Sequence, residues 1–101
     1  MAQRLSPIPP GEILLEEFLE PLKISQNKLA RDIDVPVGRV NEIIKGKRAV
    51  STDTALRLGI YFGTTPEFWV NLQSRYDLKL ARKTLLPKIE RAVRPLEPRV
   101  A

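Results

Sequence analysis

Apolar residues recur three and four positions apart in five segments of the chain, which is the spacing of helices that bury one face. The first segment begins near Gly11, the second after Ser25 and the third near Pro36. Two more follow Ser51 and Thr65. Because 101 residues leave no room for a second core, the pattern predicts an all-α protein with five helices in one domain.

The residues at the expected helix ends have the capping preferences that such positions require. Ser25, Ser51 and Thr65 carry side-chain oxygens that can accept a hydrogen bond from a first-turn backbone N–H. Pro21 is expected to end the first helix and Gly63 the fourth. The fourth helix is expected to bury Ala55, Leu56, Leu58 and Phe62.

The two ends of the chain differ in composition from the middle. Residues 1–10 include Pro7, Pro9 and Pro10 and predict an extended lead-in, because proline lacks a backbone N–H. Residues 84–101 mix three further prolines with charged residues. They predict a weakly ordered basic tail with a helical turn near residues 89–93, so the folded domain is expected to span residues 11–83.

The net charge is +5, and the excess lies at the C-terminal end. From Lys79 onward there are seven basic and two acidic residues, whereas residues 1–78 are balanced. Clustered positive charge favours a polyanionic partner. A second basic cluster surrounds Glu42 and consists of Arg39, Lys45, Lys47 and Arg48.

Missing residue types exclude several kinds of chemistry. The chain contains neither cysteine nor histidine, which removes the commonest metal ligands and the usual general base. We therefore expect no metal site, no cofactor and no enzyme activity. No apolar run approaches the roughly 20 residues of a membrane span, and the start of the chain does not resemble a signal peptide. A cytoplasmic protein without membrane contact is expected.

Residues 26–45 have the features of two closely crossing helices joined by a tight turn. Ala30 is small enough for the crossing point. Asp34 stands at the turn, where the backbone needs a positive φ that Asp tolerates. Val35, Val40 and Ile43 are expected to attach this pair to the core. The arrangement is that of a helix-turn-helix DNA-binding motif.

The motif resembles the Xre/Cro-like helix-turn-helix superfamily, which implies a lambda-repressor-like fold. The residues that carry this resemblance are Ser25-Gln26, Leu29-Ala30, Asp34-Val35, Val40 and Ile43. A more specific resemblance, to the HigA subfamily of antitoxins, covers roughly residues 10–80. It is carried by PGEIL at 10–14, GKRAVS at 46–51, DTALRL at 53–58, FGTTPEFW at 62–69, NLQ at 71–73 and YDL at 76–78. Asp34, where Gly is usual, and Gly59, where Ala is more usual, depart from the pattern.

The HigA resemblance implies a homodimer that represses its own operon. It also implies a second partner, a RelE-like (HigB-type) toxin that cleaves mRNA on the ribosome and is neutralised by the antitoxin. Two recognition helices about one DNA turn apart would read an operator that is an inverted repeat.

The segment after Pro36 is expected to enter the major groove with its polar side outward. Asn41 can read adenine, Glu42 can accept a hydrogen bond from cytosine, and Arg39 suits either guanine or phosphate. The candidates for base contact are Val37, Gly38, Arg39, Asn41, Glu42 and Lys45. The candidates for phosphate contact are Gln26, Lys47 and Arg48.

Glu12, Glu16 and Glu20 recur at every fourth position and therefore share one helical face. They form either an ordinary solvated face or a docking surface for a basic toxin. Trp69 and Tyr76 are assigned to packing rather than to ligand binding.

Two other functions remain open at this point. One is a free-standing transcription regulator without a toxin. The other is a helix-turn-helix used only for protein contact, which would show no salt-dependent affinity for DNA.

Overall fold

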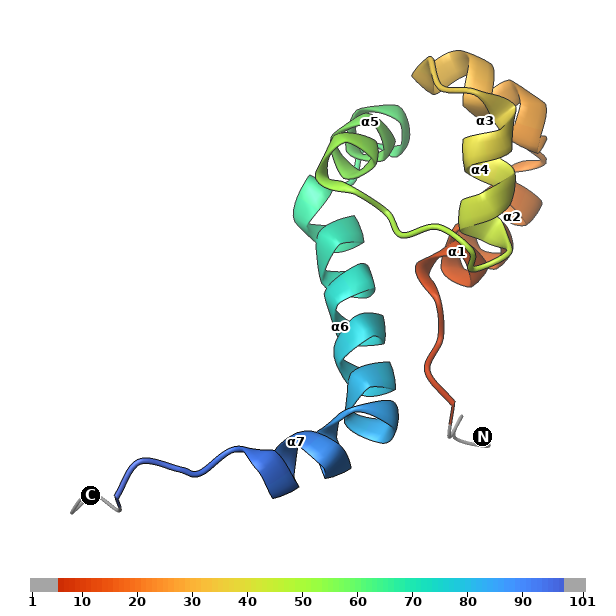
Figure 1. The fold of residues 1–101 in the computed structure, drawn as a ribbon. Coiled ribbons are helices and arrows are strands. Elements are labelled where there is room, and N and C mark those ends of the chain that lie inside the picture. Colours follow the sequence, from red (N-terminus) through yellow and green to blue (C-terminus); the bar gives the residue numbers. More distant parts are fainter. Residues whose placement is uncertain (1–5, 98–101) are drawn as a thin grey trace.

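The computed structural model describes residues 6–97 (Figure 1). In chain order its helices are α1 (Pro10–Ile13), the π-helical segment η1 (Leu14–Leu19), α2 (Glu20–Leu22), α3 (Gln26–Ile33), α4 (Val37–Ile44), α5 (Thr52–Phe62), α6 (Pro66–Thr84) and α7 (Leu86–Ala92). The first three follow one another without a break and form one N-terminal helix with a wide turn in its middle. Residues 6–97 contain no strand, which confirms the all-α prediction.

The N-terminal helix runs past Pro21, so the expected end at that residue was wrong. In a regular α-helix the ring of a proline clashes with the carbonyl group four residues earlier. The π-helical turn η1 lies directly before Pro21, and its wider spacing relieves this clash. Accordingly, the backbone N–H of Glu20 bonds to the carbonyl oxygen of Leu15, five residues back. The helix ends instead at Lys23, which adopts a left-handed φ of 57°.

The other helix ends follow the local signals in the sequence. The side-chain oxygens of Ser25, Ser51 and Thr65 each accept a hydrogen bond of 3.0 to 3.2 Å from the backbone N–H three residues later, which confirms the three predicted caps. Asp34 at the turn has a φ of 62°, and Gly63 after α5 has a φ of 73°. Both adopt the left-handed conformation that the sequence predicted there.

Close backbone contacts hold the N-terminal helix and α6 against the rest of the domain. A Cβ atom on Gly11 would overlap the carbonyl oxygen of Ile43, so α1 touches the end of α4 directly. A Cβ atom on Gly59 would lie 3.1 Å from the carbonyl oxygen of Thr64. The glycine at position 59 therefore marks close packing between α5 and the start of α6.

Trp69 lies fully buried at the centre of an aromatic cluster, which confirms its assignment to packing. Its ring lies 5.0 Å from those of Phe18 and Phe68, and its indole N–H donates a 2.8 Å hydrogen bond to Thr64 Oγ1. Leu56 is 51% exposed, so its predicted burial was wrong. The other apolar core residues are Leu14, Leu19, Leu29, Ala30, Ile33, Val40, Ile43, Val50, Ala55 and Leu58.

The C-terminal part of α6 and all of α7 project from this core as an arm (Figure 1). The Cα radius of gyration is 17.2 Å, whereas a compact chain of this length would have about 13 Å. Helix α7 is longer than the single turn expected near residues 89–93 and begins at Leu86. The arm is helical and exposed, so the sequence underestimated its regular structure.

Candidate nucleic-acid interface

Helix α4 is attached to the core by one side and leaves its polar side accessible. Val40 and Ile43 are each only 2% exposed, which anchors the helix. Asn41 and Glu42 are half-buried at the rim of the helix and are not enclosed by the core. Val37, Gly38 and Lys45 are exposed. Five of the six candidates for base contact therefore lie on an accessible side of α4, whereas the sixth, Arg39, is half-buried and lies 3.8 Å from Asp53 of α5.

The start of α4 differs slightly from the prediction. Pro36 is the N-cap residue, with extended backbone, and the helix begins at Val37. Since Pro36 has no capping side chain, the first backbone N–H groups of α4 have no side-chain cap. These donors lie beside Val37 and Gly38, at the end of a recognition helix that usually meets DNA.

Glu42 and Arg48, which were predicted to make separate contacts with DNA, form an ion pair with each other in the structure. Arg48 Nε donates a 2.7 Å hydrogen bond to Glu42 Oε1. Each side chain is about half exposed, which leaves the pair open to solvent and weak in net stability. The ion pair links the loop after α4 to Glu42 on the helix, and the neighbouring Lys47 is exposed.

Gln26, a candidate for phosphate contact, occupies the first position of α3 beside its Ser25 cap. Its side-chain oxygen is buried and has no hydrogen-bond partner among residues 6–97. Leaving a buried acceptor unpaired is costly, so a hydrogen-bond donor that reached this oxygen would stabilise the Gln26 side chain.

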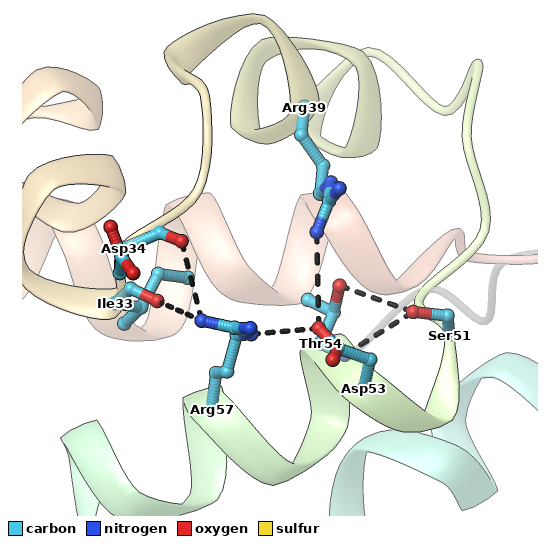
Figure 2. Close-up of polar contacts among 7 residues, drawn as sticks. All are labelled: Ile33, Asp34, Arg39, Ser51, Asp53, Thr54 and Arg57. Atoms are coloured by element: carbon cyan, nitrogen blue, oxygen red, sulfur yellow. Dashed lines mark hydrogen bonds and ion pairs between the residues drawn. The ribbon is translucent and has the colours of Figure 1, made fainter.

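A polar network joins α5 to the helix-turn-helix (Figure 2). Asp53 Oδ1 accepts a 2.7 Å hydrogen bond from Arg57 Nε, one turn later on the same helix. The same oxygen lies 3.8 Å from Arg39 Nη1 on α4. One carboxylate therefore orients two guanidinium groups, and one of these belongs to a candidate for DNA contact.

Arg57 also holds the turn between α3 and α4. Its Nη1 atom donates to the carbonyl oxygens of Ile33 at 2.8 Å and of Asp34 at 3.2 Å. Carbonyl groups at the end of a helix lack intrahelical partners, and a cation placed there stabilises them. Figure 2 shows the Arg57 side chain reaching from α5 to this turn.

Neither Asp53 nor Arg57 was among the site residues predicted from the sequence. Both lie in the DTALRL segment, and Arg57 lies more than twenty residues from the carbonyl groups that it caps. The spacing of Asp53 and Arg57 by four residues was the one local signal of their pairing.

Hydrogen bonding shifts the acidities in and next to this network. The Arg57 guanidinium lowers the pKa of Asp53 below its usual 3.8, and Arg39 adds a smaller effect of the same sign. Lys28 and the Tyr61 hydroxyl likewise lower the pKa of Asp32, at the outer side of α3. Both carboxylates are thus held in their charged forms at neutral pH.

The acidic residues of the N-terminal helix lie on a different element from the candidates for DNA contact. Glu16 and Glu20 are exposed, and Glu12 is half-buried. Their role in binding a partner stays a prediction. The described part of the chain holds no group of three or more acidic residues that could bind a metal ion, and none of its helices is long and apolar enough to cross a bilayer.

Known proteins match this arrangement closely. The family described as "Helix-turn-helix" matches residues 15–69. Antitoxin HigA of Pseudomonas aeruginosa, solved with the higBA promoter, is 46% identical and covers 90% of this chain and 99% of its own, with a TM-score of 0.87. An addiction module antidote protein of a HigA family from Coxiella burnetii is 51% identical and covers 91% of this chain and all of its own, with a TM-score of 0.85.

A third relative is described in more general terms. An uncharacterised HTH-type transcriptional regulator of Haemophilus influenzae is 46% identical over 68 residues, which is 67% of this chain and 64% of that protein. The chain thus spans slightly less than two thirds of that relative's length. These relatives are regulators and antitoxins, not enzymes, in agreement with the prediction from residue types. The chain belongs to the helix-turn-helix family and, within it, to the HigA-type antitoxins.

Proposed function

We propose that the protein is a sequence-specific DNA-binding antitoxin that represses its own operon. The observation that carries this proposal is the accessible side of α4, with Asn41 and Glu42 at its rim and Val40 and Ile43 fixed in the core. A rigidly attached helix with a free polar side is what major-groove reading requires. The promoter present in the P. aeruginosa HigA structure supports the same role.

The proposed binding unit is residues 11–83, acting as a homodimer on an inverted repeat. Val37, Gly38, Arg39, Asn41, Glu42 and Lys45 are assigned to the bases, and Gln26, Lys47 and Arg48 to the phosphates. Arg39 and Arg48 are held by carboxylates in the free protein, at 3.8 and 2.7 Å. These exposed pairs are weak enough to exchange for phosphate oxygens when DNA binds.

The test is a titration of the DNA fragment that directly precedes the gene, followed by fluorescence anisotropy. We expect tight binding to this fragment, far weaker binding to a scrambled fragment of equal length, and an affinity that falls steeply with salt. Footprinting should protect two half-sites about one helical turn apart. Equal affinity for both fragments, or an affinity that does not change with salt concentration, would refute the proposed sequence-specific DNA binding.

We also propose that the second partner is a RelE-like (HigB-type) toxin that docks on Glu12, Glu16 and Glu20. This surface is negatively charged and lies on a different helix from α4, which supports a basic partner. Pull-down of the product of the adjacent gene should be lost when the exposed pair Glu16 and Glu20 is reversed to lysine, while DNA binding persists. If the variant still captures the product of the adjacent gene, these residues form an ordinary solvated face instead.

A free-standing regulator is the alternative, and the description of the Haemophilus influenzae relative favours it. In that case the adjacent gene would encode no small toxin, and DNA binding would be unaffected by any neighbouring protein.

A further inference from the structure

The loop between α4 and α5 carries two of the cations assigned to DNA phosphates, Lys47 and Arg48. Its start is attached to α4, because the backbone N–H of Lys47 donates a 2.8 Å hydrogen bond to the carbonyl oxygen of Glu42. Its end is attached at Val50, which is only 5% exposed. The place of the two cations therefore depends on how both ends of the loop are held.

The side chain of Gln73 binds the end of this loop to α6. Its Oε1 atom accepts a 2.7 Å hydrogen bond from the backbone N–H of Val50, which lies 23 positions earlier in the chain. Both residues are withdrawn from solvent at least in part. A backbone N–H that is removed from water and has no partner is costly, so this hydrogen bond favours one position of the loop over others.

Asp77 determines which end of the Gln73 amide faces the loop. Its Oδ1 atom accepts a 2.9 Å hydrogen bond from Gln73 Nε2, one helical turn earlier on α6. An ionised carboxylate can only accept and a backbone N–H can only donate, so both partners require the same orientation of the amide. A rotated amide would set two donors against each other at Val50 and two acceptors against each other at Asp77.

From these contacts we infer that Gln73 is a positioning residue for DNA binding, which keeps Lys47 and Arg48 in place for the phosphates. Asp77 contributes by orienting the Gln73 amide. A pocket of about 250 Å³ lies between the loop and α6, and all four of these residues line it. The loop therefore has free space beside it into which it can move when the hydrogen bond is lost. This inference rests on the proposed DNA binding and names the residues of α6 that support its phosphate contacts.

Exchanging the amide and the carboxylate between the two positions tests this inference. In Gln73→Glu the new carboxylate faces Asp77, so the two like charges repel each other and turn the side chain away from Val50. Adding Asp77→Asn places a donor opposite the new carboxylate, so the double variant has the native hydrogen-bond pattern and the native net charge. Ser74→Glu is the matched control, because it adds the same charge at the next, exposed position of α6.

Affinity is measured by anisotropy on the DNA fragment that precedes the gene, at a temperature where circular dichroism shows every variant folded. We expect Gln73→Glu to weaken binding by about tenfold, since one hydrogen bond to a charged group contributes on the order of that factor. The dependence on salt should become less steep, whereas the preference over a scrambled fragment should persist. The double variant should regain native affinity, and Ser74→Glu should keep it. Native affinity of Gln73→Glu, an equal loss in Ser74→Glu, or no recovery in the double variant would each overturn the inference.

Hydrogen exchange of the Val50 amide, followed by NMR without DNA, reports the hydrogen bond itself. Protection should fall in Gln73→Glu and return in the double variant, and unchanged protection would contradict the inference. The outcomes also separate the inference from the proposed function. A native protein that binds no DNA refutes the function and the inference together. Tight binding by the native protein that is unchanged in Gln73→Glu refutes the inference alone.

Discussion

Arg57 on α5 donates a 2.8 Å hydrogen bond to the backbone carbonyl oxygen of Ile33, the last residue of α3. This single contact ties the end of one helix of the DNA-binding motif to a helix that carries no candidate for DNA contact. The same guanidinium group bonds to Asp53, which also faces Arg39 on α4. The orientation of α4 therefore depends on residues outside the motif.

Replacing Arg57 by alanine should lower both the melting temperature and the affinity for the operator. The carbonyl groups of Ile33 and Asp34 would lose the hydrogen-bond donor that caps them. Asp53 would lose one of its two arginine partners and keep only Arg39. Circular dichroism and anisotropy measure the two effects. Arg57→Lys is the matched control and should retain part of both, since an ammonium group can still donate. If Arg57→Ala retained native stability and affinity, the turn would not depend on the hydrogen bonds from Arg57.

Gly11→Ala should destabilise the fold by about 1 to 3 kcal/mol, because its Cβ atom meets the backbone of Ile43 and cannot be accommodated by a side-chain movement. Gly38→Ala is the matched control: a Cβ atom there meets nothing within 4 Å. Gly38 is the second residue of α4, so the alanine should stabilise the protein by up to about 1 kcal/mol, less than at a central helix position. Urea denaturation of both variants checks the signs, and similar effects would contradict the packing described for Gly11.

Asn41→Ala and Lys47→Ala should weaken DNA binding in different ways. Loss of Asn41 should remove about 1 to 3 kcal/mol of discrimination at one base position in each half-site. Loss of Lys47 should weaken all sequences about equally and reduce the dependence of affinity on salt. A set of operator variants, each titrated at several salt concentrations, separates the two patterns. Identical patterns for both variants would refute the assigned roles.

Trp69→Ala should cost about 3 to 5 kcal/mol, because it removes the largest fully buried side chain of the core. Thr64→Val should cost less, about 1 to 3 kcal/mol, since it leaves the indole N–H without its acceptor but keeps the packing. Denaturation followed by circular dichroism measures both losses. A larger loss for Thr64→Val than for Trp69→Ala would contradict this order.

Acid should weaken the network between α4 and α5. A carboxylate whose pKa is lower in the folded than in the unfolded state stabilises the fold above its unfolded pKa. That contribution disappears as the pH falls below the usual 3.8 toward the folded pKa of Asp53. Melting temperatures between pH 6 and pH 2 should thus fall less steeply for Asp53→Asn than for the native protein. Identical acid profiles would show that Asp53 titrates with its ordinary pKa.

The sequence predicted the features that depend on neighbouring residues. Ser25, Ser51 and Thr65 cap helices through bonds that span only three positions, so residue type and place suffice to recognise them. Asp34 was recognisable as the turn residue for a similar reason, since few residues other than glycine adopt its left-handed backbone.

Features that depend on distant parts of the chain were missed or wrong. Leu56 has the residue type of a core position, but it is 51% exposed on α5. Pro21 was read as a helix end because the compensating π-helical turn has no established sequence signal. The reach of Arg57 to Ile33 spans 24 positions and arises only once α3 and α5 are packed together.

The π-helical turn at Leu14–Leu19 also sets the phase between the two halves of the N-terminal helix. It inserts the equivalent of one additional residue, so everything beyond it is rotated by about 100° relative to an unbroken α-helix. The helix is anchored on both sides of the middle of this turn: Gly11, before the turn, touches Ile43, and Phe18, near its end, lies against Trp69. A deletion of one residue within this turn would make the helix more regular and would force the protein to give up one of its two anchorages.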